Sequence, residues 1–157
     1  MKRDLRIEIA PEYFPPLESM ARIGHADVCV VRADYQYSRQ SYQNRTRIRN
    51  ADGWQWLTVP VLSGQFGSQI GAMKIDDPRS WRSRHMKGLR YNYSTAPFYE
   101  HFIPDVEQIL SHEMTNLADL THRTLKWSAA AIGFDTLFVS GSVALTGPTE
   151  RRLTMRQ

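Results

Sequence analysis

The stretch between Asp34 and Pro60 carries the side chains best suited to bind a negatively charged ligand. No acidic residue interrupts it between Asp34 and Asp52, and its arginines are Arg39, Arg45, Arg47 and Arg49. The polar residues interleaved with these arginines are Tyr35, Gln36, Tyr37, Gln40, Tyr42, Gln43, Asn44 and Asn50. Guanidinium groups match the geometry of phosphates and carboxylates. We expect a polar loop that binds a ligand and is held against an aromatic strand.

A second basic stretch lies between residues 78 and 99. It contains Arg79, Arg82, Arg84, Lys87 and Arg90 and no acidic residue. If the two basic stretches converge, they attract an anion such as a phosphate, a nucleotide or an acidic carrier. If they form two solvated faces that never meet, this attraction is lost, and the sequence leaves both arrangements open.

His85 is the titratable side chain best suited to act as a general base. Trp81, His85, Leu89 and Tyr93 recur at intervals of four, which places them on one stripe of a predicted helix. Nearby arginines disfavour a protonated imidazole, so a neutral His85 could accept a proton at neutral pH. A histidine on an apolar stripe is also typical of a hydrogen-bonded core residue, and this alternative stays open.

Alternating rings and arginines also suggest a nucleic-acid surface. The residues concerned are Tyr35, Tyr37, Arg39, Tyr42, Arg45 and Arg47. Proteins that bind single strands stack aromatic rings on bases and place arginines on phosphates. A non-catalytic RNA or single-stranded DNA binder is therefore an alternative, although the same residues would serve a nucleotide-linked donor.

Signatures of cofactor and metal sites do not occur. No GxGxxG motif follows a strand, and neither GQFG nor SGSVALTG contains the lysine of a phosphate-binding loop. Asn116 stands where a zinc-protease motif beginning at His112 would need its second histidine. We expect no cofactor and no metal. Cys29 is the one cysteine and lies in an apolar run, which predicts a buried structural thiol.

The predicted architecture is a single α/β domain over residues 1–157, with a central, mostly parallel sheet, flanking helices and a β-hairpin. Strands at 7–10 and 28–31 enclose a helix that starts near Pro15, which predicts a parallel βαβ unit. Ligands of such sheets bind beyond the carboxyl ends of the strands, so Tyr13, Asp34 and Gln36 should lie near one another. Asp34 could pair with the arginines that follow it or hold a substrate hydroxyl or amine.

The remaining elements follow from periodicity and capping. Alternation in WQWLTVPV places Leu57, Val59 and Val61 on one side and Trp54, Trp56 and Thr58 on the other. We expect a strand at 54–61, a turn at 63–68 and a returning hairpin strand at 70–75.

Three helices should follow, and a last strand is expected at 136–139. The first is opened by residues 76–78, with Ser80 as a possible cap, and the second starts at Pro104, with Val106, Ile109 and Leu110 inward. The third is capped by Asn116 and Gly133, and its residues on one face are Leu117, Leu120, Thr124, Ser128 and Ala131.

Hydropathy indicates neither a membrane segment nor a secretion signal. No run approaches the roughly 18 apolar residues of a membrane span. The N-terminal sequence MKRDLRIEIA has no apolar segment of the kind found in signal peptides. We expect a cytoplasmic protein, and its oligomeric state is not indicated.

Several motifs together resemble the WbqC-like proteins of bacteria. They are Ala10–Pro15 (APEYFP), Ala26–Val28 (ADV), Asp34–Tyr37 (DYQY), Gln43–Ile48 (QNRTRI), Trp56–Pro60 (WLTVP), Trp81 with His85, and Tyr91–Tyr99 (YNYSTAPFY). Their order and spacing match over most of the chain. The resemblance implies a role in the biosynthesis of surface polysaccharide such as O-antigen. The reaction type we consider is transfer of an acyl or aminoacyl group to an amino sugar, or transfer of a glycosyl group.

The resemblance also carries polar residues over to this chain. They are Tyr13, Asp34, Gln36, Asn44, Arg45, Arg47, His85 and Tyr93. In a transferase, Arg45 and Arg47 would hold an anionic donor, either a nucleotide-sugar or an acyl carrier. Asp34 and Gln36 would orient the sugar acceptor, and His85 would act as the general base.

This chain departs from the family pattern in composition and length. Ala10 stands where a glutamine is frequent, Glu18-Ser19 where a Gly-Tyr pair is frequent, and Ala33-Asp34 where an acidic pair is usual. Family members run well past 200 residues, so we expect the C-terminal third to be missing. An inactive truncated remnant is therefore a further alternative.

Overall fold

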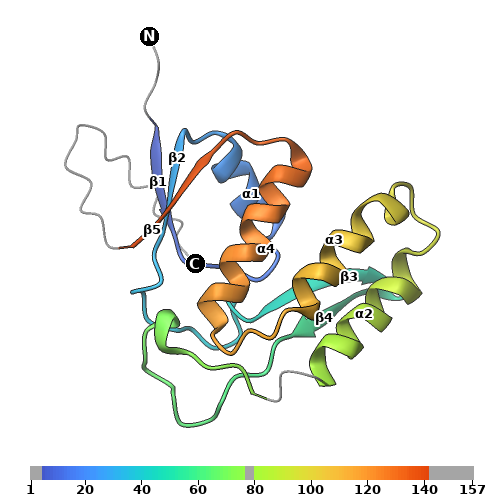
Figure 1. Ribbon diagram of the computed structural model, residues 1–157, viewed down its shortest axis with the longest axis horizontal. Coiled ribbons are helices and arrows are strands. Elements are labelled where there is room, and N and C mark those ends of the chain that lie inside the picture. Colours follow the sequence, from blue (N-terminus) through green and yellow to red (C-terminus); the bar gives the residue numbers. More distant parts are fainter. Residues whose placement is uncertain (1–4, 77–79, 142–157) are drawn as a thin grey trace.

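A three-stranded parallel sheet forms one half of the computed structural model, which describes residues 5–76 and 80–141 (Figure 1). The strands lie in the order β1-β2-β5 and span Arg6–Ile9, Val28–Val31 and Leu137–Ser140. Ile7 is in register with Cys29, and Cys29 with Phe138. The predicted parallel βαβ unit is confirmed, and the predicted last strand is confirmed with a shift of one residue.

Both helices that cover this sheet lie on one of its faces. They are α1 (Leu17–Gly24) and α4 (Leu117–Ile132). Met20 of α1 and Leu125 of α4 pack against Cys29 and Val31, which share a face because strand side chains alternate. Cys29 is fully buried as expected, and burial raises the pKa of its thiol to about 12. Beside this cluster, α1 approaches Phe134 so closely that a Cβ atom on Gly24 would lie 2.6 Å from the ring.

An antiparallel hairpin forms the second sheet, and it differs from the predicted one. Its strands are β3 (Arg45–Asn50) and β4 (Gly53–Thr58). The predicted polar loop over 45–50 is therefore wrong, because alternation along RTRIRN buries Thr46 and Ile48 on one face. The turn is closed by a hydrogen bond of 3.1 Å from Asp52 N to Asn50 Oδ1, and Gly53 follows with φ +130°.

The prediction that residues 70–75 form the returning strand of the hairpin is also wrong. Ile70–Ala72 forms a 3₁₀ turn, η1, instead. Part of the expected pairing remains, because Val61 and Ile75 form an isolated antiparallel bridge. The predicted alternation in β4 is confirmed, with Leu57 buried and Trp54 53% exposed.

Two helices, α2 (Ser80–Tyr93) and α3 (Tyr99–Ser111), pack beside the hairpin. The predicted stripe of α2 is confirmed by the buried Trp81 and His85, whereas Asp77 and Pro78 lie outside the described residues. Helix α3 begins at Tyr99, so the predicted start at Pro104 is wrong. Pro104 lies inside the helix. Proline has no backbone N–H group, so one backbone hydrogen bond is lost there, but the helix continues to Ser111.

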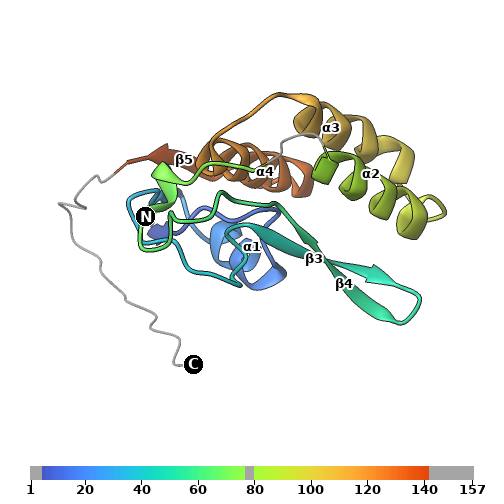
Figure 2. The same cartoon turned by 90° about the horizontal axis from the view of Figure 1, so that it is seen from below.

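Helix α4 connects the two packed clusters of the described chain. Asn116 caps it by accepting a hydrogen bond of 2.8 Å from Ala118 N, and Gly133 ends it with φ 87°, as predicted. Leu120 belongs to the cluster around Trp81, and Leu125 belongs to the cluster on the parallel sheet. Seen from below, α2, α3 and α4 form one layer, and α1 and the hairpin lie beneath it (Figure 2).

None of the helices in residues 5–76 and 80–141 combines the length and the hydrophobicity that crossing a bilayer requires.

Candidate functional site

The hairpin exposes a surface that we call the arginine–tryptophan face, formed by Arg45, Arg47, Trp54, Trp56 and Tyr42. Strand alternation places these strand side chains on the side of β3 and β4 opposite to the buried Thr46, Ile48 and Leu57. Arg47 lies directly across from Trp56 in the register of the hairpin. A ribbon with a buried inner face thus presents its basic and aromatic residues outward.

Aromatic rings hold the two arginines of this face. The Arg45 Cζ atom lies 3.9 Å from the centre of the Trp56 ring, and the Arg47 Cζ atom lies 5.2 Å from the Trp54 ring. Arg47 Nε also donates a hydrogen bond of 2.7 Å to Tyr42 Oη, and Arg45 donates to the carbonyl oxygen of Gln40. Cation–π contacts of this kind fix the position of a guanidinium without neutralising its charge.

No carboxylate within residues 5–76 and 80–141 forms a salt bridge with Arg45 or Arg47. The ion pairs of Arg32 with Glu8 and Asp34 lie elsewhere. The charges of Arg45 and Arg47 therefore remain available to an anion. Trp54, with 53% of its surface exposed, adds a flat ring on which a base or a sugar could stack.

An apolar cavity of about 390 Å³ lies under the inner face of the hairpin, next to the free edge of β3, and is lined there by Thr46, Ile48 and Leu57. Its lining includes Phe14, Leu89, Tyr93, Phe102, Ile103 and Trp127. Tyr93 Oη accepts a hydrogen bond of 2.8 Å from Arg49 N, which places Tyr93 against this edge. Tyr93 could be identified from the sequence but Phe102 and Trp127 could not, because three helices and both strands of the hairpin contribute to the cavity and no single motif contains its lining.

His85 and Tyr13 form a buried pair in the core. Tyr13 Oη lies 2.8 Å from His85 Nδ1, and His85 Nε2 lies 3.1 Å from the carbonyl oxygen of Thr58. Burial lowers the pKa of His85 against the opposing hydrogen bond to Thr58, and with a smaller lowering by the charge of Arg84 the pKa is about 4. The imidazole is therefore neutral, and both of its nitrogens are occupied by protein groups.

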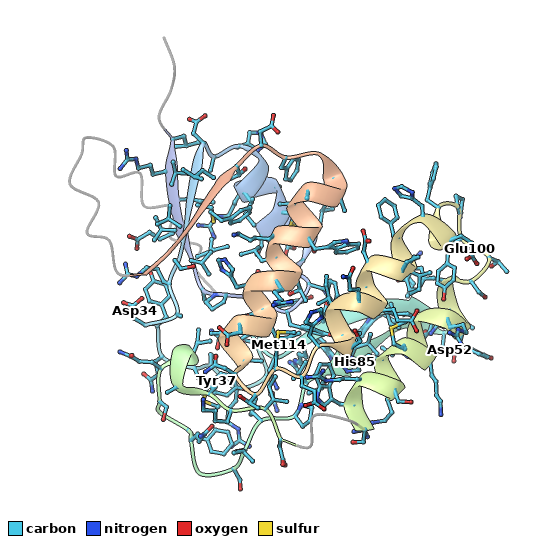
Figure 3. The ribbon with its side chains drawn as sticks, viewed as in Figure 1. Asp34, Tyr37, Asp52, His85, Glu100 and Met114 are labelled. Atoms are coloured by element: carbon cyan, nitrogen blue, oxygen red, sulfur yellow. The ribbon has the colours of Figure 1, made fainter. Side chains whose placement is uncertain are left out.

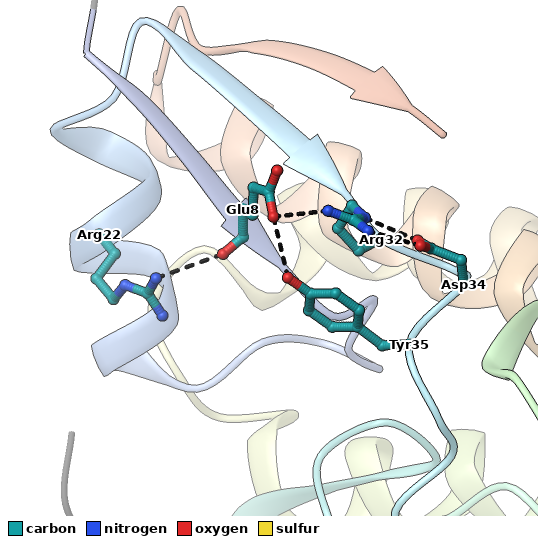
Figure 4. A network of polar contacts seen from close by, with 5 residues as sticks. All are labelled: Glu8, Arg22, Arg32, Asp34 and Tyr35. Atoms are coloured by element: carbon teal, nitrogen blue, oxygen red, sulfur yellow. Dashed lines mark hydrogen bonds and ion pairs between the residues drawn. The ribbon is translucent and has the colours of Figure 1, made fainter. Parts of the chain in front are cut away.

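Asp34 belongs to a different part of the molecule. Figure 3 shows it beside the end of β2, well separated from His85 in the core near α2. Its carboxylate receives two hydrogen bonds, of 2.8 and 2.6 Å, from Arg32, which also pairs with Glu8 at 2.7 Å (Figure 4). The hydrogen bond from Arg32 holds the pKa of Asp34 below its ordinary value. Asp34 thus pairs with the arginine before it, not with those that follow.

The other two amide residues named as site residues take part in the fold. The backbone of Gln36 forms an isolated bridge with that of Gln69, and the Asn44 side chain is buried and donates a hydrogen bond of 3.0 Å to the carbonyl oxygen of Val59. Tyr13 points into the core, so Tyr13, Asp34 and Gln36 have three different surroundings. Arg45 and Arg47 are the predicted site residues that share one exposed surface.

The two basic stretches lie on different sides of the hairpin. Helix α2 packs against the inner face, where Gly88 approaches Leu57 and Ile48. Arg82 donates hydrogen bonds to carbonyl oxygens at the end of α3, including one of 2.9 Å to Leu110. It therefore stabilises the carbonyl end of that helix rather than adding to an anion site.

No three His, Cys, Asp or Glu side chains converge as metal ligands in the described part of the chain.

Comparisons with known proteins agree with the motifs noted in the sequence. The model of the WbqC-like protein family matches residues 10–155. A Mycobacterium tuberculosis protein, described as Uncharacterized protein Rv1507c, is 31% identical over 130 residues, which cover 82% of this chain and 56% of that protein. The chain thus spans little more than half the length of this relative, and no solved structure matches it significantly. Because the family match extends over most of the sequence, this chain belongs to the WbqC-like protein family.

Proposed function

We propose that this chain binds the anionic donor of a group-transfer reaction in surface-polysaccharide biosynthesis, and that it does so on the arginine–tryptophan face. The observation that carries the proposal is the pair of arginines, Arg45 and Arg47, which stack on Trp56 and Trp54 without a carboxylate partner in the described residues. The assignment to polysaccharide biosynthesis comes from the resemblance to WbqC-like proteins.

The chemistry of this surface suits a donor with a phosphate and a flat or apolar group. Guanidinium groups bind phosphate oxygens through charge-assisted hydrogen bonds. The exposed Trp54 ring offers a stacking surface for a base or a sugar. The neighbouring cavity, lined by Phe102 and Trp127 among others, could hold an acyl group. A nucleotide-sugar and an acyl carrier therefore both fit, and they differ in whether the cavity is occupied.

In this proposal His85 is a positioning residue rather than the general base. Its ring nitrogens contact Tyr13 and Thr58, and its side chain is 3% exposed. It connects α2 to the end of β4 and so supports the strand that carries Trp54 and Trp56. We propose that Asp34 and Gln36 bind no part of the donor, because they lie away from Arg45.

The test is ligand-induced thermal stabilisation and quenching of tryptophan fluorescence. The probes are a uridine-diphosphate sugar, acetyl-coenzyme A and an oligothymidylate, each at several salt concentrations. A ligand at about 100 times its dissociation constant stabilises by about 2.7 kcal/mol. We expect the shift to disappear in Arg45→Ala and Arg47→Ala and to persist in Arg90→Ala, which removes the same charge from α2.

Binding of single-stranded nucleic acid is the second candidate function. The observation that favours it is the alternation of aromatic rings and arginines along the hairpin. Stabilisation by oligothymidylate alone would support it, with affinity falling steeply with salt by about 0.7 log units per contacted phosphate and decade of salt. His85→Ala should leave this binding intact if the variant folds. A cooperative melt without response to any probe would contradict both candidates and favour a folded chain without activity.

A further inference from the structure

A second hollow lies at the carboxyl ends of the parallel strands, away from the arginine–tryptophan face. Its volume is about 380 Å³, which is within the range of small-molecule sites. In Figure 1 the ends of β2 and β5 lie on the opposite side of α4 from the hairpin. Open parallel sheets bind ligands beyond the carboxyl ends of their strands. We call this hollow the strand-end crevice.

The floor of the strand-end crevice is apolar. Pro11 follows β1 and Val31 ends β2, and Met114 comes from the segment before α4. All three residues are buried, and the parts of them that line the crevice form a small hydrocarbon surface. A ligand here would need one apolar side to lie on this floor.

The rim is polar and carries charges of both signs. Asp119, His122 and Arg123 lie three and four residues apart on α4, so they project from the same side of the helix. Ser140 at the end of β5 faces them, with its Oγ atom 3.5 Å from His122 Nδ1. A simple anion would be repelled by Asp119 and a simple cation by Arg123. The rim therefore favours an uncharged ligand with many hydrogen-bonding groups.

The imidazole of His122 is neutral at neutral pH. Partial burial lowers its pKa, the charge of Lys126 lowers it further, and Asp119 opposes both effects. A neutral imidazole offers one donor and one acceptor. Together with the carboxylate of Asp119 and the guanidinium of Arg123, it can pair with hydroxyl groups in either direction.

From this arrangement we propose that the strand-end crevice binds a neutral sugar ring. The C–H face of the ring lies on Pro11, Val31 and Met114, and its hydroxyl groups form hydrogen bonds with the rim residues Asp119 and His122. Sugar rings have this combination of an apolar face and a polar edge. The proposal concerns residues that do not belong to the arginine–tryptophan face, so the two sites can be tested separately.

The sugar could arrive free, as part of a glycan, or linked to a nucleotide. The test follows backbone amide signals of the ¹⁵N-labelled chain during titration with methyl glycosides of N-acetylglucosamine and galactose, with the uridine-diphosphate derivative of N-acetylglucosamine, and with inorganic phosphate. We expect saturable shifts of Ala33 and Ser140 with at least one glycoside. Tighter binding of the nucleotide derivative with the same shifts would assign the nucleotide-linked sugar as the ligand.

Variants decide whether the crevice residues make the contacts. Asp119→Asn and His122→Gln should each weaken binding about tenfold, as expected for loss of one hydrogen bond to a charged or buried group. Lys126→Gln is the matched control on the same helix, because Lys126 does not line the crevice, and it should bind as the parent does. The proposal is overturned if no glycoside shifts these signals, if phosphate alone does, or if Asp119→Asn, an exposed and structurally mild change, binds with unchanged affinity.

Discussion

The hydroxyl group of Tyr13 lies 2.8 Å from Nδ1 of His85, a residue on another element of the fold. The opposite nitrogen of the ring, Nε2, lies 3.1 Å from the carbonyl oxygen of Thr58, which can only accept a hydrogen bond. The proton of the neutral ring is therefore on Nε2, and Nδ1 accepts the hydroxyl proton of Tyr13. Burial raises the pKa of Tyr13, which keeps this hydroxyl group protonated.

Removing the Tyr13 hydroxyl should destabilise the fold. Tyr13→Phe leaves Nδ1 of His85 without a donor in a buried site, which costs about 1–3 kcal/mol. Urea unfolding measures this loss. Tyr91→Phe is the control, because Tyr91 is 86% exposed and its change should be within about 0.5 kcal/mol. Equal stability of Tyr13→Phe and the parent would mean that the hydrogen bond contributes nothing.

His85 should make stability depend on pH in the acidic range. Its pKa is about 4 in the folded protein, against an ordinary value of 6.5. Between these values the unfolded chain takes up a proton that the folded protein does not, so stability is complete above about pH 6.5 and falls as the pH decreases toward 4. The difference corresponds to about 3 kcal/mol when the whole interval is crossed.

Urea midpoints at several pH values across this interval test the effect. His85→Gln should show a smaller loss of stability on acidification than the parent, because the glutamine side chain does not take up a proton in this range. His101→Gln should behave like the parent, since His101 is exposed. An unchanged pH profile in His85→Gln would assign the acid sensitivity to other groups, among which His122 also has a lowered pKa.

Asn116 should stabilise the start of α4 through two separate hydrogen bonds. Its Oδ1 atom accepts from Ala118 N at 2.8 Å, and its Nδ2 atom donates to the carbonyl oxygen of Gly71 at 2.8 Å. Asn116→Ala removes both and should cost about 0.5–2 kcal/mol. Asn116→Asp keeps the cap and removes only the bond to Gly71, so thermal unfolding should rank it between the parent and Asn116→Ala. A ranking with Asn116→Asp below Asn116→Ala would contradict the cap.

Elements with local signals could be predicted from the sequence, and those that depend on distant partners could not. The βαβ unit follows from an apolar run and a helical period close together in the chain, and Asn116 and Gly133 mark both ends of α4. Strand β3 was missed because its outward residues are arginines, and a charged alternation resembles a polar loop when the buried face contains only Thr46 and Ile48.

The candidate site shows the same division. The helical stripe that contains His85 could be predicted from spacing. Tyr13, the hydrogen-bond partner of His85, is 72 residues away in the sequence, so it could not be inferred that protein groups already bind the imidazole. The contact of Arg45 with the Trp56 ring depends on the pairing of β3 with β4, whereas the sequence predicts that the strand of Trp56 pairs with residues 70–75. The strand-end crevice required the position of α4 across the sheet, which no local pattern contains.

Asp34 should contribute to stability in a salt-dependent manner and should not affect ligand binding at the arginine–tryptophan face. Its pair with Arg32 is partly exposed to solvent, so added salt screens it. Asp34→Asn should lower the melting temperature slightly at low ionic strength, and the difference should vanish at high ionic strength. Asp52→Asn, an exposed carboxylate in the hairpin turn, is the control and should show no such dependence. Loss of probe binding in Asp34→Asn without loss of stability would instead assign Asp34 a direct role in holding substrate.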